Sequence, residues 1–229
     1  GTFAPIDLVI QESTVFNCTP PNPCGGASIY AGWRVMSLAI ATLSTAIAGS
    51  EDPSRATAEW GGGMPSLQLT GENRDGSPYT LMMTDSPMLG GGARYDKDGI
   101  HAANVLGSTN TSIPNVEYHE QRYPLLYLRR GLREGSGGAG KYRGGMGGEY
   151  AVTLHGAEET TANAFQHRRD SPPFGLFGGF PGQTGAIERY DFGDADLAEM
   201  DLDGADPATV FGRRNDEVTL TAGEVIHVR

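Results

Sequence analysis

The feature that most constrains this chain is the stretch 117–148, where a short apolar segment leads into a long glycine-dense loop. Residues 125–128 are apolar and strand-like, and two arginines follow them. The loop then carries Lys141 and Arg143 among its glycines. It is too long for an ordinary hairpin connection, which has about two to five residues, so it must serve a purpose beyond reversing the chain.

Two interpretations of this loop are open from the sequence. In one, the backbone N–H groups of Gly137, Gly138 and Gly140 form a nest for an anion, and Lys141 and Arg143 supply positive charge. In the other, only glycine fits because two backbones cross closely there, and Arg143 pairs with an internal carboxylate. The loop is not a Walker motif, because no Lys-Ser/Thr pair follows its last glycine.

Composition narrows the class of protein. The 229 residues include 34 glycines, about twice the average usage of roughly 7%. The glycines cluster without a fixed period, which excludes collagen and favours many turns between short strands. The net charge of −11 disfavours nucleic acids and anionic membranes as partners, because phosphate binding needs a basic surface.

The apolar pattern predicts a β-rich α+β domain with one long buried helix, part of a larger subunit. Apolar residues recur every three or four positions over 29–48, and Gly49 ends this helix. Strands are expected at 6–10, 66–70, 79–83, within 116–130, and at 149–154. We expect 149–154 to pair with the strand in 116–130, and 217–220 and 225–228 to form a closing hairpin.

Several polar residues are candidates for chemistry. Glu117 and His119 would share one face of a strand, where a Glu/His pair can transfer protons or simply lie at an interface. Asp96 and Asp98 precede a glycine, a pattern more typical of turn capping than of a metal site, so we assign no metal ligand.

Cys18 and Cys24 are the two cysteines, and no second Cys/His pair at zinc spacing accompanies them. Two unpaired thiols, a disulfide and half of a metal site are all compatible with this spacing. So few cysteines are typical of a cytoplasmic protein. Residues 30–48 are too polar to span a bilayer comfortably.

Two glycine motifs stand out in the second half of the sequence: SGGAGKYRGG at 136–145, which is the more specific, and PFGLFGGFPG at 173–182. In this order they resemble the hydantoinase B/oxoprolinase family, and the sequence is most similar to its acetophenone carboxylase-like branch. The other matching residues are Gly91, Gly92, Ala93, Asp98, Gly99, Pro114, Glu117, Glu120 and Pro124. The similarity extends over nearly all of residues 1–229.

The resemblance implies an enzyme component that works with a hydantoinase A-type ATP-binding subunit. It implies ATP and a divalent metal, Mg or Mn, bound mainly by other segments or subunits. The substrate would be a small carbonyl compound, either a cyclic amide that is hydrolysed or an aryl ketone that is carboxylated. Lys141, Arg143 and Glu117 would then be the catalytic candidates. A non-catalytic assembly module of such a complex is the alternative.

The resemblance also implies that residues 1–229 are the C-terminal part of a subunit, with a further boundary near residue 110. A strand-like start directly after Gly1 is in keeping with a processed product, a split subunit or one piece of a longer polypeptide. A separate chain carrying the N-terminal half of the family pattern is therefore an expected partner.

Overall fold

The computed structural model describes residues 7, 9–14, 16–22, 32–61, 65–83, 89–103, 112–165, 168–211 and 216–229. The longer helices are α1 (Trp33–Ala48) and α2 (Val116–Arg122), and the short 3-10 turns are η2 (Pro53–Arg55) and η3 (Leu197–Glu199). The strands are β1 (Ser66–Glu72), β2 (Pro78–Met83), β3 (Leu125–Leu132), β4 (Gly148–Leu154), β5 (Glu159–Phe165), β6 (Ile187–Asp191), β7 (Thr209–Val210), β8 (Asp216–Thr221) and β9 (Glu224–Val228).

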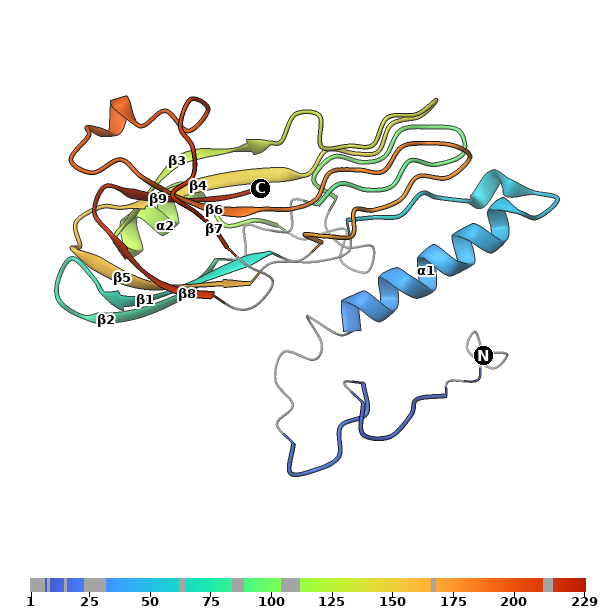
Figure 1. Ribbon diagram of the computed structural model, residues 1–229, viewed down its shortest axis with the longest axis horizontal. Coiled ribbons are helices and arrows are strands. Elements are labelled where there is room, and N and C mark those ends of the chain that lie inside the picture. The colour runs from blue at the N-terminus through green and yellow to red at the C-terminus, as the bar shows by residue number, and fades with distance from the viewer. Residues whose placement is uncertain are drawn as a thin grey trace.

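Two antiparallel sheets pack face to face at one end of the structure (Figure 1). The first has the strand order β2-β1-β5-β8 and the second the order β3-β4-β9-β6-β7. Their facing side chains form one core, with Leu67 and Met83 from the first sheet and Tyr150 and Ile226 from the second. The prediction of a β-rich α+β domain is confirmed, as is the antiparallel pairing of β3 with β4.

The expected hairpin at the end of the chain is wrong, because β8 and β9 belong to different sheets. β8 pairs with β5, whereas β9 pairs with β4 on one edge and β6 on the other. Every residue of β9 is buried. Because β9 pairs along both of its edges within its own sheet, it has no free edge with which β8 could pair. The two-residue turn between β8 and β9 therefore crosses from one sheet to the other.

The segment before β3 is a helix and not the start of a strand. Asn115 caps α2 by accepting a hydrogen bond from the Glu117 N–H at 3.2 Å. Tyr123 ends the helix in an extended conformation because the residue before a proline avoids helical geometry. Glu117 and His119 therefore do not share a face as they would in a strand: Glu117 is exposed, whereas His119 is buried.

The long helix occurs where the apolar period places it, but most of it is not buried by the described part of the chain. Only Ala41 and Ser44 of α1 are buried, and Ile40 and Ile47 beside them are half-buried. Leu38 and Leu43 are 67% and 63% exposed. The period identified the helix correctly, but some of its large side chains are left exposed by the described residues.

The predictions for the N-terminal segment fall partly outside the described residues. Of the expected strand at 6–10, the structure describes Asp7, Val9 and Ile10, none of which is in a strand, and Val9 is 92% exposed. Cys18 is a half-buried free thiol, and Cys24 lies outside the described residues.

The outer face of the second sheet is covered by the acidic segment that follows β6. Leu202 of this segment packs against Ala151, Tyr190 and Val225. Beside this contact, buried His227 lies 3.1 Å from Glu149 through its Nε2 atom. Burial lowers the pKa of the His227 imidazole, and the Glu149 carboxylate opposes that shift. The segment is thus a packed cover and not merely a solvated loop.

Four segments, three of which carry several glycines, extend from the open end of the sandwich and lie side by side (Figure 1). We call them together the glycine lattice; they are residues 57–61, 89–103, 133–147 and 173–185. They contain no helix or long strand, and backbone hydrogen bonds join them. The N–H of Gly91 donates to Ile100 (2.9 Å), that of Gly99 to Arg143 (2.8 Å) and that of Gly145 to Gly91 (2.8 Å).

Glycine is required in the lattice because the backbones touch. A Cβ atom added to Gly90 would lie 1.9 Å from the Gly145 carbonyl oxygen, and one added to Gly145 would lie 2.0 Å from the Ile100 oxygen. Both distances are far inside van der Waals contact with a backbone that cannot rotate away. The same rule, that only glycine fits at a crowded backbone contact, holds in collagen.

Replacing Gly145 with alanine should destabilise the protein by about 3 kcal/mol, since the new methyl group overpacks against a fixed carbonyl. Gly131→Ala is the matched control, because a Cβ there meets nothing within 4 Å. Alanine is about 0.5–1 kcal/mol better than glycine within a strand, so the control should be neutral or stabilising. Chemical denaturation of both variants checks this, and equal stabilities would contradict the close packing.

Candidate functional site

A cavity of about 390 Å³ runs along the glycine lattice. At the sandwich end it is lined by Tyr150 and Val228, and at the far end by Tyr95 and Phe177. Glycine is the commonest residue in its lining. The cavity is therefore long, and much of its wall is backbone.

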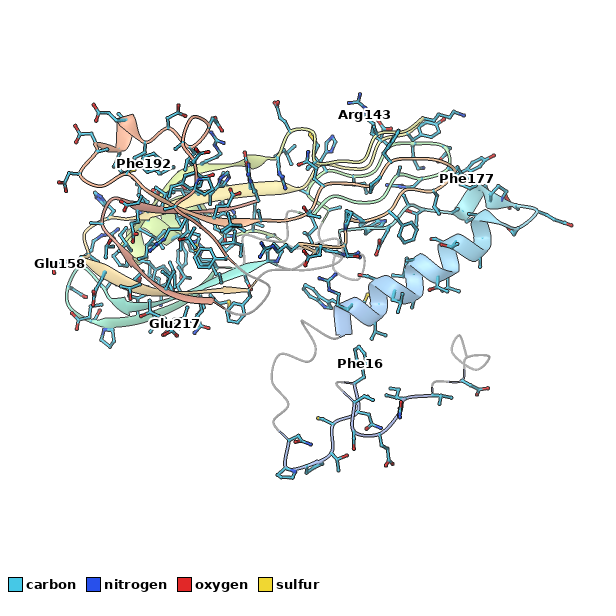
Figure 2. The ribbon with its side chains drawn as sticks, in the orientation of Figure 1. Phe16, Arg143, Glu158, Phe177, Phe192 and Glu217 are labelled. Carbon is cyan, nitrogen blue, oxygen red and sulfur yellow. The ribbon has the colours of Figure 1, made fainter. Side chains whose placement is uncertain are left out.

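The far end of the cavity is formed where the lattice segments turn back. Tyr95 and Phe177 pack edge to face there with ring centroids 5.9 Å apart, and Figure 2 shows Phe177 at this end. Lys141 lines the cavity from the neighbouring turn, and its Nζ lies 5.3 Å from the centre of the Tyr142 ring. This end thus combines a cation with exposed aromatic rings.

A buried ion pair lines the cavity from a different part of the lattice. The guanidinium of Arg168 donates to the carboxylate of Glu59, and the two side chains are only 12% and 9% exposed. The backbone N–H of Phe174 also donates to Glu59 at 3.2 Å. The carboxylate therefore joins two lattice segments that are more than a hundred residues apart in sequence.

Helix α1 approaches this ion pair with its first turn. Burial is the main cause that lowers the pKa of the Arg34 guanidinium, and the nearby charge of Arg168 lowers it further while Glu59 opposes both. The charges of Arg34 and Arg168 thus both interact with the buried carboxylate of Glu59. Because the repulsion by Arg168 outweighs the attraction by Glu59, these charges do not stabilise the charged form of Arg34.

The structure supports the packing interpretation of the predicted glycine nest. A Cβ on Gly137 would lie 2.1 Å from the Gly144 oxygen, and one on Gly138 would lie 2.2 Å from the Phe180 oxygen. Gly137 and Gly138 also line the cavity. The N–H groups of Gly137, Gly138 and Gly140 have no acceptor within the described parts of the chain. Close packing and available donors therefore coexist in the same loop.

The three predicted catalytic residues are not brought together. Lys141 lines the cavity, whereas Arg143 is exposed at the outer edge of the lattice, with its side chain pointing away from it (Figure 2). The Arg143 backbone N–H, and not its guanidinium, donates to Asp98 Oδ1 at 2.8 Å. Glu117 lies on α2 beside the sandwich, far from the end of the lattice (Figure 1).

Asp98 and His101 hold the lattice together in this structure. His101 Nδ1 accepts a hydrogen bond from the Met146 N–H at 2.9 Å, close to the contact that Asp98 makes with Arg143. Among the described residues, no three His, Cys, Asp or Glu side chains gather as a metal site would require.

Sequence reasoning did not identify Glu59 as a site residue. Glu59 has no motif around it, and its importance depends on the long-range contact with Arg168. Its one sequence signal is a carboxylate next to Trp60 and a glycine cluster. That signal does not identify a partner.

The whole chain, residues 1–229, matches the Hydantoinase B/oxoprolinase family. The protein therefore belongs to this family. The glycine motifs that carried the resemblance are the residues that build the lattice.

Two curated relatives are more than a quarter identical over most of the chain. The acetophenone carboxylase delta subunit of Aromatoleum aromaticum is 30% identical over 210 residues, which cover 90% of this chain and 30% of that protein. A 5-oxoprolinase of Dictyostelium discoideum is 28% identical over 185 residues, which cover 81% of this chain and 13% of that protein. The chain thus spans less than a third of the length of these relatives.

Two solved structures share the fold. A nucleotide-free acetone carboxylase superposes with a TM-score of 0.63 at 22% identity, over 76% of this chain and 25% of that chain. The ATP-dependent caprolactamase of Pseudomonas jessenii superposes with a TM-score of 0.61 at 21% identity, over 75% and 28% of the two chains. Within the described residues, no helix is long and apolar enough to cross a membrane.

Substituting Glu59 with glutamine should destabilise the protein by about 3 kcal/mol, because Arg168 would be left as a buried charge without its counter-ion. Asp96→Asn is the control. Asp96 lies 3.9 Å from Lys97 in a pair whose side chains are more than half exposed, and such pairs contribute little. The free energies of unfolding of the two variants test this prediction. A Glu59→Gln protein as stable as the Asp96→Asn control would contradict the claim that the Glu59–Arg168 pair stabilises the fold.

Proposed function

We propose that this chain is a component of an ATP-dependent enzyme complex that acts on a carbonyl substrate after phosphoryl activation by a partner subunit. The observation that carries the proposal is the family match over the whole chain. The named relatives include a carboxylase subunit and a 5-oxoprolinase, and a structural neighbour is a caprolactamase. The compounds in these names, acetophenone, 5-oxoproline and caprolactam, each contain a ketone or amide carbonyl group.

The chemistry explains why ATP is needed. An amide or ketone carbon reacts poorly at neutral pH, so its oxygen, as the carbonyl or enol, takes the γ-phosphoryl group while ADP leaves. With a cyclic amide, water would then attack the activated carbon, the ring C–N bond would break and phosphate would leave. With an aryl ketone, the α-carbon of the phosphorylated enol would form a C–C bond to bicarbonate that has itself been phosphorylated, and both phosphates would leave. Because negative charge develops during these steps, fixed cations and N–H donors lower the barrier. A cyclic amide and an aryl ketone are the two substrate classes this scheme accommodates.

Within this scheme the chain supplies groups at the end of the lattice. Lys141 lines the cavity and Arg143 presents its guanidinium on the outer edge. Lys141 would act on an anion held in the cavity, and Arg143 on one held against that edge by another chain. ATP and its Mg or Mn ion would bind mainly to the hydantoinase A-type partner and to the chain carrying the N-terminal half of the family pattern.

A second candidate function is a non-catalytic assembly module, and exposed apolar surface favours it. Phe177 and Phe180 are 62% and 71% exposed at the end of the lattice, and Leu38 and Leu43 protrude from α1. Large exposed apolar groups mark interaction sites when they gather in patches. In this alternative, the lattice and α1 dock other subunits and the chemistry lies elsewhere.

Substitution of the two cations separates these functions. Lys141→Ala and Arg143→Ala should each lower ATP-coupled turnover of the assembled complex about 100-fold if the side chain meets an anion in the transition state, as removal of one oxyanion donor does. Arg122→Ala is a matched control, since Arg122 lies on α2 and contacts the Tyr118 hydroxyl.

Turnover with a cyclic amide or an aryl ketone plus bicarbonate is measured alongside the mass of the purified complex. Lost turnover in an intact complex supports the catalytic role. A complex that loses subunits supports the assembly role. Full turnover in both lattice variants would contradict the placement of the anion site on this chain.

A further inference from the structure

The shape of the cavity limits what can fill it. Its lining reaches from Tyr150 in the sandwich core to Phe177 at the far end of the lattice (Figure 2). A compact ligand such as a single phosphate or a small ring would occupy only part of that length. A ligand that filled the whole cavity would have to reach from one end of this lining to the other.

The wall of the cavity presents backbone along most of this length. Gly137 and Gly138 line it, and their N–H groups have no acceptor in the part of the chain that the structure describes. Polar groups of this kind are normally paired, by protein or by water. The natural complement of a row of backbone donors and acceptors is another backbone, as in strand addition to a sheet edge.

The lattice shows which kind of chain packs on such a wall. Its segments are extended and bonded to their neighbours through backbone groups, and all but the short 57–61 carry several glycines. At the contacts even a methyl group collides: a Cβ on Gly138 would lie 2.2 Å from the Phe180 oxygen. A further segment could therefore approach these backbones closely only where it carries small residues.

We propose that the cavity binds an extended, glycine-rich segment of a partner polypeptide, which adds one more layer to the glycine lattice. The four segments of the lattice are the precedent, and the new layer would continue the interface they already form. The proposal concerns assembly and holds whether or not Lys141 and Arg143 take part in catalysis.

The experiment uses the full chain with a tethered probe, since tethering supplies an effective concentration near millimolar. Arg229 lines the cavity, so a ten-residue Gly-Gly-Ala-type extension is fused after it; such an extension reaches about 33 Å when extended. A second extension of equal length carries leucine at every third position. Amide hydrogen exchange at Gly137 and Gly138 is the readout.

We expect the glycine-rich extension to slow exchange at both amides at least tenfold, and the leucine-bearing one to leave it unchanged. Ala139→Leu, an exposed position in the cavity lining, should abolish the protection. Ala198→Leu, exposed on η3 outside the cavity, should preserve it. No protection, equal protection by both extensions, or protection of these two amides by inorganic phosphate alone would each overturn the proposal, the last by showing that the amides of Gly137 and Gly138 bind an anion and not a backbone.

Discussion

The structure depends on direct contact between backbones in the glycine lattice. Side chains fill the core of the sandwich, but beyond its open end the chain is held by N–H···O=C bonds between segments that are distant in sequence. Such bonds require the backbones to lie close together, and the added-Cβ distances of about 2 Å show that glycine alone permits it. Because glycine loses more conformational freedom on folding than any other residue, the lattice needs anchors, which the sandwich and the Glu59–Arg168 pair provide.

This arrangement determines where chemistry and assembly can occur. The lattice carries the exposed ring of Phe177, which packs against Tyr95, to a place well away from the hydrophobic core (Figure 2). Lys141 also lines the cavity. The side of the lattice facing the cavity offers backbone donors, while α1 and the lattice end leave large apolar side chains in solvent. A component built in this way has several surfaces suited to neighbours, in keeping with a family whose members are far longer than this chain and include a named delta subunit.

Local sequence patterns predicted the local structure well and the long-range structure poorly. The strands at 66–70 and 79–83 and the period of α1 were predicted correctly, because each pattern records burial within a few residues of sequence. The strand within 116–130 and its pairing with 149–154 were also correct. The hairpin of β8 and β9 failed, since sheet membership is decided by partners far along the chain. The placement of Glu117 and His119 at the start of a strand failed because the cap Asn115 begins a helix there, which ends before Pro124. At the site, the sequence predicted the glycine loop. It did not predict the pairing of Glu59 with Arg168 or the separation of Glu117 from Lys141, because both depend on contacts between segments that are far apart in sequence.

The central claim is that the glycine lattice is an ordered, backbone-bonded part of the fold and not a set of flexible loops. Amide hydrogen exchange on the protein tests it most directly at Gly91, Gly99 and Gly145, whose N–H groups donate across the lattice. We predict exchange within about tenfold of the amides of β1, as hydrogen-bonded core amides show. Exchange at the rate of an unstructured glycine peptide, with β1 still protected, would contradict the account.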